Sequence, residues 1–424
     1  MPTPIPRMVR VRQNFPMLPE LDLAAELARE FATLHGRIRP GARVAVAVGS
    51  RGIANLDTIV RGVLRELQRA GAAPFIIPAM GSHGGATPDG QAEVLATYGI
   101  TEAAMGVPVR ASLEVERIGT TEHGVPVMCS VEAMRADGVV VINRVKPHTD
   151  FFSDTLGSGL LKMCVVGLGK QIGAATMHGA AQRIGYEPAI RGIARVIERV
   201  APILCGVAIL ENQYHQTAKV AVVPQGEFES GEAKLYAEAR KLMPLLPFEE
   251  IDVLVVDWLG KNISGAGMDP NVIGRTVHGY TSELGRMGRR APFIRRIFLR
   301  DLTPESEGNA IGLGMADVTT TRLVNAIDRW KVCINALTSL TPQSAKTPIY
   351  FDTDRECLER TIGSVALDDP LTARVVWIAS TLEVEKFAVS EAMLPEVRGH
   401  PGLTVDGGLQ PVTFDANGNL RDLA

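Results

Sequence analysis

The segment between residues 43 and 80 constrains the fold more than any other part of the chain. Residues 43–48 (RVAVAV) form a β-branched run that ends at Gly49, and residues 75–80 (FIIPAM) form a second apolar run. Between them, residues 55–70 carry apolar side chains at helical spacing. A strand, a helix and a strand in this order predict a parallel pair joined by a right-handed crossover. The segment therefore predicts an α/β sheet.

The rest of the chain extends this pattern. A hairpin is predicted over residues 113–129, followed by a buried strand at residues 138–142. Further strands are predicted at residues 202–209, 218–223, 251–256, 296–299 and 374–378, and helices at residues 189–200, 232–243, 321–327 and 353–361. We expect two α/β domains, residues 1–246 and 247–424, with mixed, mainly parallel sheets and an active-site cleft between the domains.

Composition excludes several classes of protein. The chain has 44 Lys and Arg against 47 Asp and Glu, a net charge of −3, so no positive field favours binding to nucleic acid. Its 5 cysteines form no CxxC pair, which argues against a disulfide framework or a zinc ribbon. The longest apolar stretch, residues 202–210, is about half a membrane span. We expect a cytoplasmic protein that binds neither nucleic acid nor membrane.

Polar loops follow four of the predicted strands. They are residues 49–52 (GSRG), 81–85 (GSHGG), 143–148 (NRVKPH) and 257–261 (DWLGK). Ligands of open α/β sheets bind beyond the carboxyl ends of the strands, so these loops are candidate site segments. A single histidine in such a loop is more often a turn residue, and only the coincidence of the loops indicates a site.

A further glycine-rich segment, residues 157–162 (GSGLLK), ends at Lys162, and His178 follows it. Glycines let backbone N–H groups approach a phosphate, and a lysine adds a charge or a nucleophilic amine. The segment is not a Walker A motif, because Met163 follows the lysine. The later Gly167–Leu168–Gly169 does not complete a dinucleotide-binding GxGxxG motif either. An ordinary phosphate-binding or surface lysine is the alternative interpretation.

Taken in order, these motifs resemble the nickel-pincer lactate racemase family between residues 49 and 261. The resemblance implies a pyridinium mononucleotide that carries nickel in a sulfur–carbon–sulfur pincer, tethered to Lys162, with His178 as the nickel ligand. It implies that His83 and His148 are the acid/base pair. The cofactor-binding residues that it implies are Arg51, Ser158, Gly159, Lys162 and Lys261. Val48 stands where the family has an aspartate, and the segment from His148 to Lys162 is about one turn longer, so we expect an altered substrate pocket.

The resemblance implies a racemase or epimerase of a 2-hydroxy acid that works by hydride transfer, loaded by cofactor-biosynthesis enzymes. Such a reaction needs a base on each face of the substrate, and imidazole titrates near neutral pH. Two alternatives remain open. One is a nickel-free, phosphate- or nucleotide-binding oxidoreductase or hydrolase, and the other is a non-catalytic cofactor-binding protein. We expect Cys164 in the core, His123 and His215 in turns or on the surface, and the arginine-rich run at residues 286–300 in a solvated element or a subunit contact.

Overall fold

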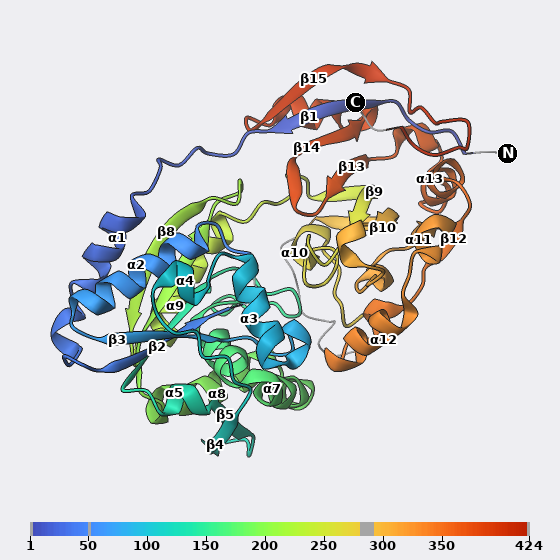
Figure 1. The fold of residues 1–424 in the computed structure, drawn as a ribbon. Helices are drawn as coiled ribbons and strands as arrows, with labels where there is room; N and C mark the ends of the chain where they lie inside the picture. The colour runs from blue at the N-terminus through green and yellow to red at the C-terminus, as the bar shows by residue number, and fades with distance from the viewer. Residues whose placement is uncertain (1–2, 50–51, 280–291, 422–424) are drawn as a thin grey trace. The chain divides into compact units, whose positions relative to one another are not determined.

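The computed structural model describes residues 3–49, 52–279 and 292–421, which form two compact units (Figure 1). The N-terminal unit consists of Met17–His148 and Ser153–Met243. The C-terminal unit consists of Met1–Pro16, Thr149–Phe152 and Pro244–Ala424. Both are built on mixed, mostly parallel sheets with helices, which confirms the predicted α/β fold class. The cleft between the domains stays a prediction.

The N-terminal unit is organised around a five-stranded sheet with the order β3-β2-β6-β7-β8. The first four strands run parallel, and β8 is antiparallel to β7. The predicted hairpin is present, but it forms a separate two-stranded sheet. The sheet is therefore mixed because of β8 and not because of the hairpin. The strands are β2 (Arg43–Val48), β3 (Ala73–Pro78), β4 (Val115–Thr120), β5 (Pro126–Ser130), β6 (Gly138–Arg144), β7 (Ile203–Glu211) and β8 (Thr217–Pro224).

The alternation of side chains along β2 explains how the helices pack. Val44, Val46 and Val48 belong to a core that includes the apolar stripe of α2, and the small Ala45 and Ala47 alternate with them. The helices of this unit are α1 (Leu23–Phe31), α2 (Leu56–Arg69), α3 (Pro88–Thr97), α4 (Glu102–Met105), α5 (Val131–Met134), α6 (Leu160–Lys162), α7 (Lys170–Ile184), α8 (Tyr186–Val200) and α9 (Phe228–Lys241). A π-helical segment, η3 (Met163–Leu168), joins α6 to α7.

The C-terminal unit contains an eight-stranded sheet with the order β12-β11-β10-β9-β13-β14-β1-β15. The strands from β12 to β13 run parallel, and β14, β1 and β15 add antiparallel strands. The strands are β1 (Met8–Gln13), β9 (Glu250–Leu259), β10 (Phe293–Leu302), β11 (Val318–Thr320), β12 (Ile349–Phe351), β13 (Val375–Ser380), β14 (Glu383–Ser390) and β15 (Leu403–Gln410). The helices are α10 (Pro270–Ile273), α11 (Thr321–Asn325), α12 (Arg329–Thr338), α13 (Asp354–Gly363) and α14 (Leu394–Gly399).

The first strand belongs to the C-terminal unit, although the sequence analysis placed residues 1–246 in one domain. β1 pairs with β14 on one side and with β15 on the other, so it lies between two strands from the end of the chain. Figure 1 shows this strand, in blue, beside the red strands. Such a pairing joins segments almost the whole chain length apart, and spacing in the sequence does not reveal it.

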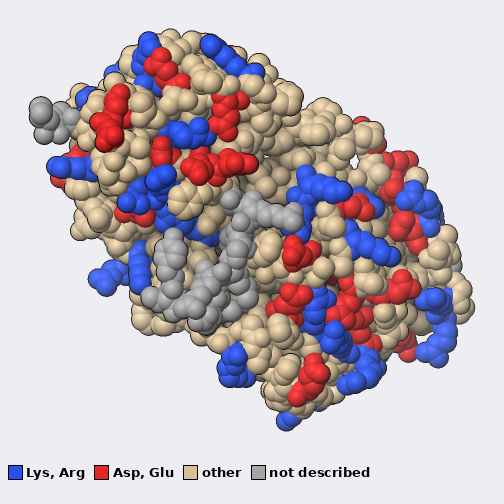
Figure 2. Space-filling view, turned by 180° about the vertical axis from the view of Figure 1, so that it is seen from behind, with Lys and Arg blue, Asp and Glu red and all other residues tan. Residues whose placement is uncertain are grey.

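The surface carries acidic and basic side chains together, as Figure 2 shows for one face of each unit. Within the described residues, no helix has the length and apolar character needed to cross a membrane. The arginine-rich run is partly described. Arg295 pairs with Asp252 at 3.0 Å, whereas Arg300 is buried and pairs with Asp257 and Asp354 at 2.6 and 2.9 Å. Arg300 is therefore an internal residue and not the solvated one that we expected.

Candidate active site

Three neighbouring strands of the N-terminal unit end together at one edge of its sheet. Val48 at the end of β2 lies in register with Pro78 of β3 and with Ile142 of β6. The loop that carries His83 follows β3, and the segment that carries His148 follows β6. The parallel sheet therefore brings the two predicted acid/base histidines to the same edge.

The loop that carries His83 is held by a buried glutamine of α3. The side chain of Gln91 is fully buried, and its Nε2 donates to the carbonyl oxygens of Met80 and Gly81 at 3.2 and 3.1 Å. Gly84 has a φ of +64°, and a Cβ there would overlap the backbone of Gly90. The loop therefore requires glycine, and it holds His83, which is half-buried, in a defined position.

The glycine-rich loop is bonded to the segment that follows β6. The Lys146 N–H donates to the Ser158 carbonyl at 2.9 Å, and the Ser158 N–H donates to the Lys146 carbonyl at 2.7 Å. Asn143 Nδ2 donates to the Gly159 carbonyl at 2.8 Å. These bonds place Lys162 beside the segment that carries the buried His148, and Lys162 Nζ donates to Ser158 Oγ at 3.3 Å.

Both glycines of this loop are required for packing against α9. A Cβ at Gly157 would overlap the Tyr236 ring, and a Cβ at Gly159 would overlap the Glu232 carboxylate. Tyr236 in turn donates from its hydroxyl to the Ser153 carbonyl at 3.2 Å. The loop thus lies directly on α9, which fixes the start of the short helix α6.

Glu232 is a residue of this site that sequence reasoning did not identify. It is fully buried, and its carboxylate accepts a hydrogen bond from the Leu161 N–H at 2.8 Å. Burial raises the pKa of Glu232 to about 7. In the sequence it is one acidic residue of a predicted helix, and only its position on the apolar side of that helix could have indicated burial.

The helical segment from α6 to α7 packs against the strand ends. A Cβ on Gly49 would lie 3.1 Å from the Met163 side chain, and a Cβ on Gly81 would lie 3.2 Å from that of Ala174. His178 is one helical turn after Ala174 and so projects from the same face of α7. This face therefore lies toward the loop that carries His83.

A buried lysine helps to fix the same helical segment. Lys170 has a φ of +54° at the start of α7, and its Nζ donates to the Pro78 carbonyl at the end of β3. Burial lowers the pKa of Lys170 to about 8. This contact joins α7 directly to the sheet edge, and no motif in the sequence indicated it.

Tyr186 connects two of the predicted histidines. Its ring is fully buried at the start of α8, and its centroid lies 6.2 Å from that of His148 and 6.1 Å from that of His178. The ring stands edge-on to His178, with an interplanar angle of 83°. His148 and His178 therefore share one aromatic neighbour, which no motif in the sequence indicated.

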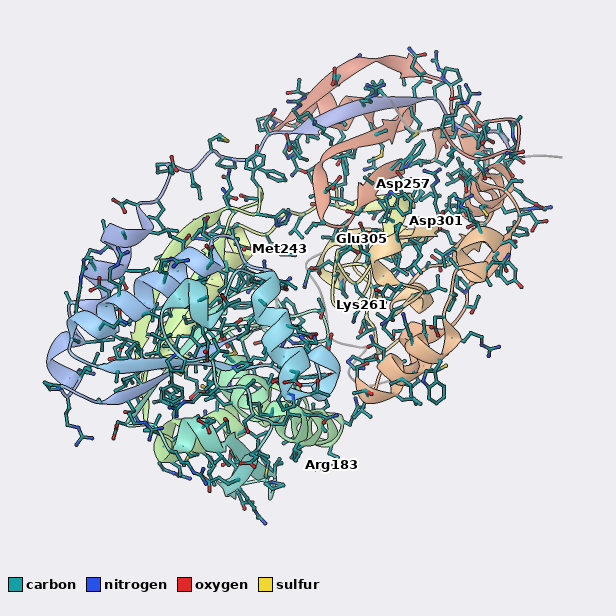
Figure 3. The ribbon with its side chains drawn as sticks, viewed as in Figure 1. Arg183, Met243, Asp257, Lys261, Asp301 and Glu305 are labelled. Atoms are coloured by element: carbon teal, nitrogen blue, oxygen red, sulfur yellow. The ribbon has the colours of Figure 1, made fainter. Side chains whose placement is uncertain are left out.

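One predicted residue belongs to the other unit, and another is not described. Lys261 lies in the C-terminal unit just after β9, where its Nζ donates to the Gly265 carbonyl at 2.9 Å (Figure 3). Arg51 lies outside the described residues. Cys164 is buried, and burial raises its pKa well above the ordinary thiol value, so the expectation of a core cysteine is confirmed.

The N-terminal unit is thus an α/β domain that gathers two histidine-bearing segments, a lysine loop and a helix with a third histidine at the carboxyl edge of its sheet. Residues 26–179 match the family model for the lactate racemase N-terminal domain. This part of the chain belongs to the lactate racemase N-terminal domain family.

Among the solved structures that are similar to this chain are two proteins of low sequence identity. One is a structural-genomics protein from Thermotoga maritima, with a TM-score of 0.49 and 14% identity, covering 67% of this chain and 72% of that one. The other is the lactate racemase apoprotein from Thermoanaerobacterium thermosaccharolyticum, with a TM-score of 0.47 and 13% identity, covering 89% of each chain. No curated protein matched the sequence.

Proposed function

We propose that the protein is a racemase or epimerase of a 2-hydroxy acid that uses a nickel-pincer nucleotide. The observation that carries the proposal is the grouping of His83, His148, Lys162 and His178 at one sheet edge, inside the segment that matches the lactate racemase N-terminal domain. Each element that positions these four residues belongs to the N-terminal unit.

The residues around Lys162 fit such a cofactor. The bonds from Lys146 and Asn143 fix the backbone of the glycine-rich loop, and Glu232 fixes the start of α6. Lys162 is half-buried and projects from this fixed backbone, so its amine is a suitable tether. Ser158 and Gly159 are proposed as its neighbours on the cofactor.

The donor chemistry at His178 also fits. Across the described residues, no three His, Cys, Asp or Glu side chains are grouped as metal ligands. A nickel ion at this site would therefore take one imidazole from His178 and its remaining donors from the pincer. Imidazole is a ligand that nickel binds well. When bound, the cofactor supplies an acceptor and donor of hydride at the substrate Cα.

The two remaining histidines supply the proton chemistry. A neutral imidazole removes the proton from the substrate hydroxyl, which makes the Cα hydrogen easier to release as hydride. On the opposite face, the other imidazole would donate a proton to the same oxygen as the inverted product forms. His83 and His148 are proposed for these roles because each follows a different parallel strand that neighbours β2.

The anionic end of the substrate or the cofactor phosphate needs a fixed cation. Arg51 and Lys261 are proposed for this role because a guanidinium or ammonium group pairs strongly with carboxylate and phosphate. Val48 stands at the end of β2, where the family has an aspartate, so this strand end lacks a negative charge. A 2-hydroxy acid larger than lactate is therefore as suitable a substrate as lactate.

The test is to express the chain together with the cofactor-biosynthesis enzymes and to measure its intact mass and nickel content. We expect a nickel-bearing adduct that maps to Lys162. Lys162→Ala should lose the adduct. Lys219→Ala is the control, because Lys219 is an exposed lysine of β8 that pairs with Glu238, and this variant should keep the adduct. His178→Ala should lose nickel, whereas His123→Ala in the hairpin turn should keep it.

Hydroxy acids are then screened with the loaded protein. Racemisation in heavy water should leave the Cα hydrogen unexchanged, and His83→Ala and His148→Ala should each slow it by at least about a hundredfold. Absence of adduct and nickel, while a lactate racemase prepared in parallel acquires both, would favour the nickel-free phosphate-binding alternative. Rapid exchange at Cα would refute hydride transfer.

A further inference from the structure

A hollow on the sheet of the C-terminal unit has no role in the proposed function. Its volume is about 490 Å³, which is within the range of pockets that bind small organic molecules. Residues of β1, β9, β13, β14 and β15 line it, and of these only Asp257 and Trp258 lie in a segment that the sequence indicated as a candidate site.

Strand register explains why the sheet is hollow here. Trp377 of β13 is paired with Ala388 of β14, Ala388 with Arg10 of β1, and Arg10 with Asp406 of β15. Paired residues project from the same face, so these four side chains form one row across the sheet. Ala388 is the small member of the row, and it leaves a space between an indole and a guanidinium group.

Cations line one side of the hollow. Arg12 of β1 is paired with Lys386 of β14, two residues along from the pair of Arg10 and Ala388 and on the same face. Arg10, Arg12 and Lys386 are exposed, and none of the ion pairs among the described residues involves them. Asp406 is the one acidic side chain beside them in the row, so this side of the hollow is positively charged.

The opposite side is bounded by the edge of the Trp377 indole, which is 5% exposed. Trp377 Nε1 donates to Asp257 Oδ1 at 2.6 Å, and Arg300 lies 5.5 Å from the centroid of the indole. Asp257, labelled in Figure 3, also pairs at 2.6 Å with Arg300, a guanidinium group that it shares with Asp354. The indole is therefore held in place before any ligand binds, which lowers the entropic cost of packing a ligand against its edge.

We propose that this hollow binds a small organic anion in which a planar ring carries a phosphate or carboxylate group. The ring lies in the hollow against the exposed edge of Trp377. The anionic group is bound by Arg10 and Arg12, whose guanidinium groups donate paired hydrogen bonds to either kind of oxyanion. Lys386 adds a third positive charge.

Calorimetric titration of the full-length protein tests the proposal with two probes, AMP for the phosphate and isophthalate for the carboxylate. We expect saturable binding of at least one probe at one site per chain, and the preferred probe identifies the anionic group. Adenosine and inorganic phosphate, each carrying one half of AMP, should bind at least about tenfold more weakly than AMP.

The variants assign binding to the hollow. Arg10→Ala and Arg12→Ala should each weaken binding about tenfold. Arg7→Ala is the matched control because Arg7 is also exposed but pairs with Glu391 at 2.6 Å outside the hollow. Both test residues are exposed on the strand, so the variants should fold, which circular dichroism checks. The proposal would be overturned if neither probe bound at millimolar concentration, or if the variant carrying both Arg10→Ala and Arg12→Ala bound as tightly as the wild type.

Discussion

The buried carboxyl group of Glu232 makes the stability of the N-terminal unit depend on pH, and Glu232→Gln should remove that dependence. The side chain is fully buried beneath Gly159 and accepts a hydrogen bond from the Leu161 N–H. Glutamine has nearly the same shape and retains a carbonyl acceptor for that bond. The substitution therefore changes the ionisation of the group more than its packing.

The magnitude follows from the pKa of Glu232, which burial raises from 4.5 to about 7. A shift of this size corresponds to about 3 kcal/mol of stability. Below pH 4.5 the carboxyl group is protonated in the folded and unfolded chains, and the contribution is fully present. Between pH 4.5 and about 7 the unfolded chain ionises first, so the contribution is lost as the pH rises through the folded pKa.

The assay compares urea unfolding of the wild type and Glu232→Gln at a series of pH values by far-ultraviolet circular dichroism. Hydrogen exchange of the peptide that contains Leu161 gives a local measurement, because all 3 tryptophans lie in the C-terminal unit and do not report on this region. The stability of the variant relative to the wild type should increase by about 3 kcal/mol from pH 4.5 to pH 8. Glu238→Gln, an exposed change on the same helix, should not alter the profile. Parallel profiles for wild type and Glu232→Gln would refute the reasoning.

Three further changes test the architecture of the site. Gly159→Ala should lower the free energy of unfolding by about 1–3 kcal/mol, because the added Cβ would overlap the Glu232 carboxylate. Gly179→Ala is the control: this glycine lies in open space on α7, and the change should raise the free energy of unfolding by up to about 1 kcal/mol. Urea unfolding measures both variants. Gln91→Leu should cost about 1–3 kcal/mol and speed hydrogen exchange in the His83 loop, because two buried carbonyls lose their donor. The wild type should become more stable as the pH rises from 8 to 10.5, because Lys170 has a pKa of about 8 in the folded chain and is neutral there, whereas it is still charged in the unfolded chain. Lys170→Met should abolish this rise. An unchanged rise in the Met variant would contradict that assignment.

The sequence predicted those elements whose signal is local. The β-branched run at residues 43–48 is β2, and the helical pattern at residues 55–70 is α2, which spans Leu56–Arg69. In both, the spacing of apolar residues within a few turns or pleats determines the element. β1, β14 and β15 were missed because alternating exposed residues weaken their apolar signal, and because their partners lie at opposite ends of the chain.

The candidate site likewise contains some residues that the sequence indicated and others that it did not. His83 and His148 became candidates because each follows a predicted strand, and the family resemblance alone implied their acid/base role. The strand register places both segments at one edge. Glu232 and Tyr186 were not identified from the sequence, because an acidic or aromatic residue on an amphipathic helix has no distinguishing pattern. Their burial depends on which surface the helix packs against, and that is decided by contacts between distant segments.

The contacts of the glycine-rich loop indicate a different role from the one that its sequence suggested. In the sequence, its glycines suggested a backbone cradle for phosphate. In the structure, the Ser158 N–H donates to the Lys146 carbonyl and the Leu161 N–H donates to Glu232, so these two donors are already used. Both glycines pack against α9. The loop therefore acts as a rigid support for Lys162, and a cofactor bound here would meet side chains more than backbone amides. Gly159→Ala, whose Cβ would overlap the Glu232 carboxylate, should therefore also displace the start of α6, which carries Lys162.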